Sequence, residues 1–570
     1  MSVLSAALWA ALLFGLSTTL YSGLCLLRNY LTARKIGVPV RIILFDHVNP
    51  LWLVCDRKVL SLVRRLPLGL GSNSFTRYNY RGWEVPDRYY SHREMGDAYI
   101  LVSSRNIWLY VADPGAVADI WRRGKDFPRE VSVTAILNIF GPNISTAQGA
   151  EWQKHRRITA SSFNDQNNVI VWSEAVAVAH DVLRYWTSRP SVATAADDLR
   201  TLSLHVMSRA GFGKSFKFQG HDEREAAAPA DISMTYKESL QIILENCILV
   251  FALGTKFLAN PWLPQKLRRI HDACTSFQNY MIQVYEEEKQ AYAQGKSAAD
   301  RNFMTSLVRA SQDETDSSSL AGLTEREIYG NMFTFNFAGH DTTAHTFTFA
   351  LYFLAANPAV QDWVSEEVCH VLGGREPHEW LLSDDFPRLK RCLAVMYETL
   401  RLYTPVPTSK FVDGHLPRTL TVGGKTLVLP PGTMLVPSYA SLQTDPRYWG
   451  GDSLEWRPSR FIIRSSPDSA SITTGTPLDS EELSAPARGT YLAWSGGARD
   501  CVGRKFSQVE FVAVMASLFR GWRVGPALRD DETPGEARER VLGQIEADSA
   551  PVLLLQMLHP ERCPLVWSRR

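Results

Sequence analysis

The stretch Trp494–Gly503, WSGGARDCVG, decides how the chain is interpreted. It places a single cysteine, Cys501, after two glycines and before a third. Because Gly496 and Gly497 lack a Cβ atom, the backbone there can adopt conformations closed to other residues and approach a flat group closely. The apolar pattern that resumes after the stretch predicts a helix, whose N-terminal partial charge favours a thiolate. The stretch therefore predicts a haem iron held by the sulfur of Cys501.

Arg499 stands two positions before this cysteine. Its guanidinium is a planar fork of donors that matches a carboxylate better than a lysine does, so it can bind a haem propionate. The alternative is a glycine-rich turn with a buried structural cysteine. An isolated Cys-x-Gly would favour that alternative, but the complete pattern favours haem.

The same stretch resembles the haem-binding signature of the cytochrome P450 superfamily, with Trp494 where that family most often has phenylalanine. The resemblance implies a mainly α-helical cytochrome P450 fold with small β-sheets. It also implies haem b as cofactor, its iron axially ligated by Cys501. Another flat aromatic ring can still cover the sulfur, so the difference at Trp494 concerns redox tuning rather than ligation.

A second match is the run AGHDTT, Ala338–Thr343, inside an apolar stretch that begins near Ile328. It resembles the family's long central helix, which crosses the distal face of the haem. Gly339 and Thr342 share a helix face, and the glycine leaves room for a diatomic ligand. Asp341 and Thr342 supply an acid and an alcohol for proton delivery during oxygen activation. The alternative is a polar helix segment whose threonine hydroxyls bond to the preceding turn.

Two further matches concern charged residues. Glu398 and Arg401 are spaced to pair on one helix face, and an isolated pair of this kind is usually solvated and worth little. The run Pro458–Phe461 adds Arg460. In the resembled family these three residues form a buried network behind the cysteine loop, which is costly to break at one member. We therefore interpret them as structural, not catalytic.

Trp152 and Arg156 lie four positions apart and can reach one haem propionate from a single helix face. The alternative is a basic amphipathic surface helix, because Lys154 and His155 crowd the same stretch. The other motifs favour the propionate role. Lys410 lies near the position where many relatives carry an arginine for the other propionate.

The N-terminus carries an uncharged run, Ser2–Leu27, and a bilayer core requires about 20 such residues as helix. Arg28, Arg34 and Lys35 follow it, so the positive-inside tendency leaves the remaining chain in the cytosol. We expect a single-pass anchor in the endoplasmic reticulum membrane. A cleaved secretory peptide is the alternative, but it normally has a basic first segment and a shorter apolar core.

The predicted domains follow from these signals. Residues 1–28 are the anchor, 29–75 a basic, proline-containing linker near the membrane, and 76–570 one haem-thiolate catalytic domain. Two polar segments, 312–319 and 465–490, read as surface excursions. The net charge of +2 gives no reason to expect nucleic acid. The eight cysteines form no Cys-x-x-Cys pair, so the sequence signals neither a zinc site nor a disulfide framework.

Apolar periodicity predicts four long helices and five short strands. The helices are expected at 172–186, 267–293, 328–356 and 360–372. The strands are expected at 98–102, 107–111, 420–422, 426–429 and 551–557.

The resemblance implies a monooxygenase that inserts one oxygen atom of O2 into a C–H bond or alkene. This chemistry requires two electrons, and the chain has no Gly-x-Gly-x-x-Gly fingerprint for a flavin or nicotinamide. We therefore expect NADPH-cytochrome P450 reductase as partner, docking near Arg504 and Lys505. The motif wording resembles microsomal enzymes of filamentous fungi, many of which act in secondary metabolism.

The resembled fold implies which segments would line the substrate pocket, and because most of their side chains are apolar, the expected substrate is a lipophilic small molecule. These segments are 131–144, 333–337, 404–411 and 547–551. Two other functions remain open. One is a haem-thiolate isomerase or dehydratase that needs neither O2 nor a reductase. The presence of Asp341 and Thr342 argues against this function. The other is a membrane haem sensor without turnover, which has no evident need for that pair.

Overall fold

The computed structural model describes residues 3–130, 134–221, 234–295, 302–312, 322–464 and 477–570. The chain divides into two compact units. The first comprises residues 1–130, 407–454 and 486–500, and the second comprises 131–406, 455–485 and 501–570. The structure is mainly helical with small sheets, which confirms the predicted fold class. The range 76–570, predicted as one domain, contributes to both units.

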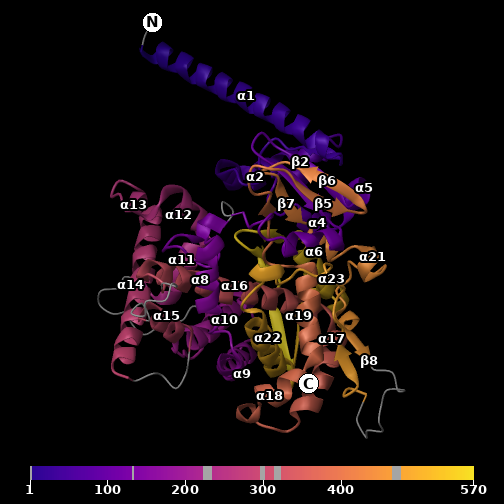
Figure 1. Ribbon diagram of the computed structural model, residues 1–570. Helices are drawn as coiled ribbons and strands as arrows, with labels where there is room; N and C mark the ends of the chain where they lie inside the picture. The colour runs from indigo at the N-terminus through magenta and orange to yellow at the C-terminus, as the bar shows by residue number, and fades with distance from the viewer. Residues whose placement is uncertain (1–2, 131–133, 222–233, 296–301, 313–321, 465–476) are drawn as a thin grey trace. The chain divides into compact units, whose positions relative to one another are not determined.

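The first unit is built on a five-stranded sheet in the order β1-β2-β3-β7-β4, of which Figure 1 labels β2 and β7. Neighbours β1/β2 and β3/β7 are parallel, whereas β2/β3 and β7/β4 are antiparallel. The strands of this unit are β1 (Val40–Ile42), β2 (Ala98–Val102), β3 (Ile107–Val111), β4 (Lys410–Phe411), β5 (Arg418–Val422), β6 (Lys425–Leu429) and β7 (Met434–Pro437). Its helices are α1 (Val3–Ile36), α2 (Pro50–Arg64), α3 (Ser74–Tyr78), α4 (Glu84–Asp87), α5 (Tyr90–Met95), α6 (Pro114–Arg122), α20 (Tyr439–Leu442), α21 (Pro446–Trp449) and the 3-10 turn η7 (Gly497–Arg499).

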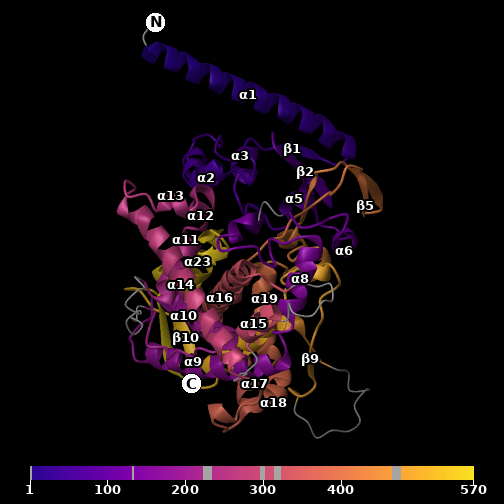
Figure 2. The same cartoon turned by 60° about the vertical axis from the view of Figure 1, so that its left-hand side comes forward.

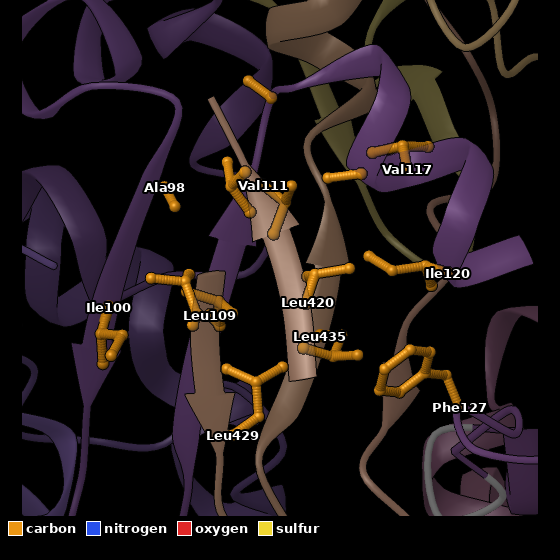
Figure 3. Close-up of a cluster of buried hydrophobic side chains, with 14 of the residues drawn as sticks. Ala98, Ile100, Leu109, Val111, Val117, Ile120, Phe127, Leu420, Leu429 and Leu435 are labelled. Carbon is orange, nitrogen blue, oxygen red and sulfur yellow. The ribbon is translucent and has the colours of Figure 1, made fainter. Parts of the chain in front are cut away.

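Both faces of β2 and β3 are buried, because their side chains alternate between two apolar clusters. On one face, Ile100 and Leu109 pack with α6 and with the β5–β6 hairpin (Figure 3). On the other face, Tyr99 and Tyr110 stack with ring centroids 5.3 Å apart. The strands predicted at 98–102 and 107–111 are therefore confirmed, and so are those within β5 and β6.

Helix α1 continues past the predicted end of the anchor at residue 28. Its last turns pack on the first apolar cluster through Leu26, Tyr30, Ala33 and Ile36. The Nδ2 atom of Asn29 donates to the carbonyls of Ser103 and Ser104 at 3.1 and 3.2 Å. The range 29–75, predicted as a linker, instead supplies β1 and α2 to the first unit. Among the described residues, no helix is both long and apolar enough to cross a bilayer, so the anchor stays a prediction.

The second unit is largely helical (Figures 1 and 2). Its first helices are η1 (Ala135–Leu137), α8 (Gly149–Ala160), α9 (Asp165–Thr187), α10 (Ala195–Phe212), α11 (Tyr236–Glu245), α12 (Cys247–Leu253), α13 (Thr255–Leu258), α14 (Gln265–Ala293) and α15 (Phe303–Gln312). The later ones are α16 (Glu325–Ala356), α17 (Pro358–Leu372), η3 (Pro377–Glu379), α18 (Leu382–Asp385), η4 (Phe386–Arg388), α19 (Lys390–Leu402), η5 (Pro458–Phe461), α22 (Arg504–Phe519), α23 (Pro534–Ala547) and η8 (Pro560–Arg562). All four predicted helices are confirmed, as α9, α14, α16 and α17.

Helix α16 is the centre of this unit and contacts α10, α22 and α23. It begins at a capping box in which Thr324 and Glu327 each bond the other's backbone N–H. One turn later the Asn331 amide accepts from the Ile144 backbone and donates to His155 Nδ1 at 2.7 Å. These bonds fix the first third of α16 against the chain segment that leads into α8.

Short antiparallel pairs complete the second unit: β8 (Ile462–Arg464) with β9 (Glu481–Leu483), β10 (Trp522–Pro526) with β13 (Leu565–Arg569), and β11 (Ser549–Pro551) with β12 (Leu555–Met557). The strand predicted at 551–557 is wrong in part. A turn at Val552–Leu554 splits that run into a hairpin. Of the predicted surface excursions, 313–319 and 465–476 lie outside the described residues, whereas β9 belongs to a sheet.

Candidate functional site

The cysteine loop owes its shape to contacts with α6 inside the first unit. Gly497 has a φ of +70°, and a Cβ there would lie 2.6 Å from the carbonyl oxygen of Trp121. A Cβ on Gly496 would lie 3.3 Å from the Trp121 ring. Gly497 is therefore required by its positive φ and its close approach to the Trp121 backbone, and Gly496 packs tightly against the Trp121 ring. The loop ends in the exposed, reduced Cys501, three residues before α22 begins at Arg504.

A group of cations accompanies this loop within the first unit. Lys410 is buried, and its backbone pairs with that of Arg129 in an isolated antiparallel β-bridge. Burial, with the charges of Arg129 and Arg499, lowers the pKa of Lys410 to about 8. Burial and the charge of Arg129 lower the pKa of Arg499 to about 10. Three positive charges gathered away from water favour an anionic ligand at this place.

Helix α16 has one open stretch in an otherwise buried surface. Ala338 is exposed and Gly339 and Thr342 are partly exposed, whereas their neighbours along the helix are buried. The Thr342 hydroxyl donates to the Ala338 carbonyl at 2.7 Å. The predicted glycine and threonine thus do share an accessible helix face.

The packing around Gly339 differs from the predicted reason for a glycine. A Cβ there would lie 2.7 Å from the sulfur of Met207 on α10. The absent Cβ therefore accommodates the Met207 side chain of α10 against α16, and the predicted room for a diatomic ligand stays a prediction.

Asp341 points toward α10, away from the open face that carries Thr342. Its carboxylate accepts from Arg200 Nε at 2.9 Å and lies 3.5 Å from His345 Nε2. Burial opposes ionisation, but the charges of His345 and Arg200 outweigh it and hold the pKa of Asp341 well below its usual range. Asp341 is thus an ionised carboxylate at neutral pH and carries no proton of its own to donate.

A cavity of about 200 Å³ lies beside Asp341 and is formed entirely by the second unit. Its walls come from α10, α11, α16 and the β11–β12 turn, and include Arg200, Leu204, Leu240, Gln241, Leu244 and Leu553. The lining combines apolar and charged side chains. It therefore suits water together with the polar end of a mainly apolar molecule.

The predicted pocket segments have different surroundings. The turn directly after 547–551 supplies Val552 and Leu553 to the cavity beside Asp341. Phe333 lies 5.1 Å from Phe140 and Phe335 lies 4.5 Å from Phe303, measured between ring centroids, so the aromatic run is core. Thr404 is buried, and its hydroxyl donates to the Leu400 carbonyl in the last turn of α19 at 2.6 Å. Residues 131–133 lie outside the described part of the chain.

On α8, Trp152 and Arg156 are both partly buried and share a helix face, as predicted. The residues between them face elsewhere. Lys154 Nζ lies 2.8 Å from both Glu151 and Glu327. Glu151, His155 and Glu327 approach closely enough to share a cation, and the lysine ammonium already occupies that role.

The predicted three-residue network is confirmed. Arg401 donates twice to Glu398, at 2.7 and 2.9 Å, and Arg460 donates to the same carboxylate at 2.8 Å. The backbone N–H of Arg457 donates to it as well, at 2.7 Å. Glu398 and Arg401 are fully buried, so the network fixes α19 against η5.

Comparison with known proteins identifies the family. The sequence model of the family described as "Cytochrome P450" matches residues 81–547. The chain belongs to the cytochrome P450 family. It is 30% identical to the phomenoic acid biosynthesis cluster cytochrome P450 monooxygenase of Leptosphaeria maculans, over 90% of this chain and 91% of that protein. It is 29% identical to a cytochrome P450 monooxygenase of Postia placenta and 25% identical to one of Arthrobotrys oligospora, over 82% and 90% of this chain and 86% and 90% of those proteins.

Membership implies a haem cofactor with cysteine thiolate ligation, and the residues present fit it. Cys501 is exposed and reduced in the matching position. The cations Lys410 and Arg499 suit propionates, and their lowered pKa values show that an anion would stabilise them. The accessible stretch of α16 suits the distal face.

Several residues that shape the site of this cytochrome P450 could not be predicted from the sequence. Trp121, Arg129, Arg200 and Met207 match no motif, because each acts through a contact that only the fold creates. Arg200, for example, lies 141 residues before its partner Asp341. A tryptophan or a lone arginine in an amphipathic helix gives no signal of such a role.

Proposed function

We propose that this cytochrome P450 is a monooxygenase that hydroxylates or epoxidises a lipophilic small molecule of secondary metabolism. The observation that carries the proposal is the Cys501 loop, held against Trp121 and accompanied by buried cations. The Leptosphaeria relative, named for the phomenoic acid biosynthesis cluster, supports the pathway class. The apolar part of the cavity beside Asp341 supports a lipophilic substrate.

The chain's own residues would hold the cofactor in defined ways. Cys501 ligates the iron, and Arg499 and Lys410 bind propionate charge. Trp152 and Arg156 supply an indole N–H and a guanidinium from one face of α8. When bound, haem with a thiolate ligand supplies activation of O2.

Proton delivery falls to Thr342 and Asp341 in different roles. Thr342 holds its hydroxyl on the accessible face of α16 through the bond to Ala338. Asp341 lies on the cavity side and is ionised, so it acts as an acceptor that passes on a proton received from water there. Arg200 keeps that carboxylate charged and oriented.

Electrons would come from NADPH-cytochrome P450 reductase. Arg504 and Lys505 are both exposed at the start of α22, although Lys505 Nζ lies over the Phe386 ring, 3.7 Å from its centroid. Charge reversal at Arg504 should slow reductase-driven haem reduction more than reversal at Lys505. Equal reduction rates in both variants and the native protein would contradict this docking face.

We also propose attachment to the endoplasmic reticulum membrane with the remaining chain in the cytosol. Apolar side chains along α1 are exposed to solvent, among them Leu12, Phe14, Leu16 and Leu20. Such a surface is stabilised in lipid rather than in water. Sedimentation of the full-length protein with microsomes resistant to alkaline carbonate would support this, and a wholly soluble protein would contradict it.

The decisive experiment compares purified holoprotein with Cys501→Ser. The native protein should give the carbon monoxide difference spectrum of thiolate-ligated haem, and the variant should lose it. Cys369→Ser, which removes another exposed cysteine, is the matched control and should leave the spectrum unchanged. Retention of the thiolate spectrum in Cys501→Ser would overturn the proposal.

Turnover then separates the remaining functions. A monooxygenase forms product only with NADPH, reductase and O2 together. Product formation without O2 or reductase would indicate an isomerase or dehydratase. Thiolate-ligated haem with no turnover of any extract from the producing organism would indicate a sensor.

A further inference from the structure

Trp121 of the first unit contacts the cysteine loop at two neighbouring glycines. It lies near the end of α6 (Figure 3 labels Val117 and Ile120 of this helix), and α6 contacts the η7 turn of the cysteine loop. The ring of Trp121 lies under Gly496, and its carbonyl oxygen lies against Gly497. Two backbone positions of the loop are therefore set by one residue.

The same ring also contacts a cation. Lys410 Nζ lies 4.6 Å from the ring centroid, a distance at which an ammonium is attracted by the indole face. Trp121 thus connects the lysine of β4 with the glycine turn that precedes Cys501. A change in the ring position would move both.

The indole N–H of Trp121 is buried and has no hydrogen-bond partner in the described part of the chain. A buried indole N–H usually finds an acceptor, because leaving it unpaired costs about 1–3 kcal/mol. The nearby charged groups Lys410, Arg129 and Arg499 are all donors. The same place therefore offers an unpaired N–H and three positive charges to one anion.

We propose that Trp121 is a positioning residue for haem, whose Nε1–H donates to a haem propionate while its ring fixes the cysteine loop. The proposal adds a donor from α6 to those that the motifs indicate, namely Trp152, Arg156, Arg499 and Lys410. It depends on haem binding by this family member. A protein that binds no haem would refute the proposed function, whereas bound haem that is indifferent to Trp121 would refute this inference alone.

The experiment measures haem transfer from holoprotein to excess apomyoglobin, together with the ferric/ferrous reduction potential. Trp121→Phe keeps an aromatic ring and removes the N–H. Haem should leave this variant about tenfold faster, because a hydrogen bond to a charged group is lost. The potential should fall, since the propionate charge is less neutralised and the ferric state is favoured.

Three comparisons isolate the N–H. Trp121→His keeps a ring N–H and should release haem more slowly than Trp121→Phe. Haem dimethyl ester, which has no propionate charge, should remove most of the difference between native protein and Trp121→Phe. Trp108→Phe is the matched control, because it loses an indole bond to Asp46 at 3.1 Å in the same unit, and its haem release should be native.

The inference is overturned if Trp121→Phe releases haem at the native rate, or if Trp108→Phe accelerates release equally. It is also overturned if the dimethyl ester preserves the full difference, because the ring alone would then account for it. Should Trp121→Phe fail to fold, the Trp121→His variant still tests the inference. If this variant releases haem and haem dimethyl ester at equal rates, a bond to the propionate is contradicted.

Discussion

Glu510 is a residue of α22 whose carboxyl side chain lies in the protein interior. It is fully buried, and neither of its oxygen atoms has a hydrogen-bond partner in the described structure. The Ser203 hydroxyl on α10 favours the charged form, but burial outweighs it. Burial raises the pKa of Glu510 to about 8, so this side chain is largely neutral at pH 7.

This raised pKa makes stability depend on pH. In the unfolded chain the glutamate has a pKa of about 4.3, so between that value and about 8 the folded state binds the additional proton. Its contribution to the free energy of unfolding is present below about pH 4.3 and falls by about 1 kcal/mol per pH unit as the pH rises toward 8. Glu510→Gln should remove this loss. Urea unfolding at pH 5.5 and 8 should therefore give a smaller difference for the variant than for the native protein, and an identical difference would contradict the assignment.

Glu398 shows the opposite case, a buried carboxylate with every partner in place. Glu398→Ala should lower the free energy of unfolding by about 3–5 kcal/mol, because Arg401 and Arg460 would keep their charges inside the protein and lose the carboxylate that both contact. Asp181→Ala is the control, since its partner Arg184 is solvent-exposed and the pair is worth under about 1 kcal/mol. Denaturant titration of both variants tests this, and equal losses would refute the structural role.

The contrast between these residues shows what sequence can predict at this scale. Glu398, Arg401 and Arg460 lie in short runs with recognisable spacing, and the structure joins them as expected. Glu510 has no such run, and its burial depends on helices that meet only in the fold. The ionised state of Asp341 was missed for the same reason, because the sequence does not reveal Arg200 as its partner.

At the scale of elements, α16 is fixed at its start by the crossing of two backbones. A Cβ on Gly330 would lie 2.4 Å from the carbonyl oxygens of Gly141 and Pro142. Backbone atoms cannot yield as a flexible side chain does. The helix therefore approaches that segment only because residue 330 is glycine.

Gly330→Ala should consequently lower the thermal midpoint, although alanine is the better helix former. Gly543→Ala is the matched control within α23, where a Cβ would meet nothing within 4 Å. That variant should gain up to about 1 kcal/mol. The two substitutions are chemically identical, so their opposite signs in thermal unfolding would isolate the crossing, and a gain in both would contradict it.

Elements themselves were largely predictable where a periodic pattern is long or alternates clearly. Helix α16 and strands β2 and β3 appear at nearly the predicted residues, because burial on one or both faces leaves a regular apolar pattern. The run 551–557 misled because its apolar residues continue through the turn between β11 and β12. Continuous hydrophobicity does not show where a hairpin reverses.

At the scale of the whole molecule, neither compact unit is a continuous piece of sequence. The first unit draws on three separate segments, and its boundary falls between Asp500 and Cys501, inside the stretch that identifies the family. Motif order along the chain cannot reveal such a division. The same limitation explains why residues 29–75 read as a linker although they contribute a strand and helices to the first unit.

The two ends of α1 should consequently behave differently on truncation. Deletion of residues 1–22 removes a segment in which the large apolar side chains that the structure describes, from Trp9 to Tyr21, are exposed, and should leave the thermal midpoint of the remaining protein unchanged. Deletion of residues 1–36 also removes Ala33 and Ile36 from the apolar cluster and Asn29 from its two carbonyl partners. It should cost about 2–4 kcal/mol, because one large and several smaller apolar groups lose their burial. Differential scanning calorimetry of the two detergent-solubilised proteins tests this. Equal midpoints would mean that the end of α1 does not stabilise the sheet. A large fall in the midpoint on the shorter deletion would mean that the first turns of α1 stabilise the protein.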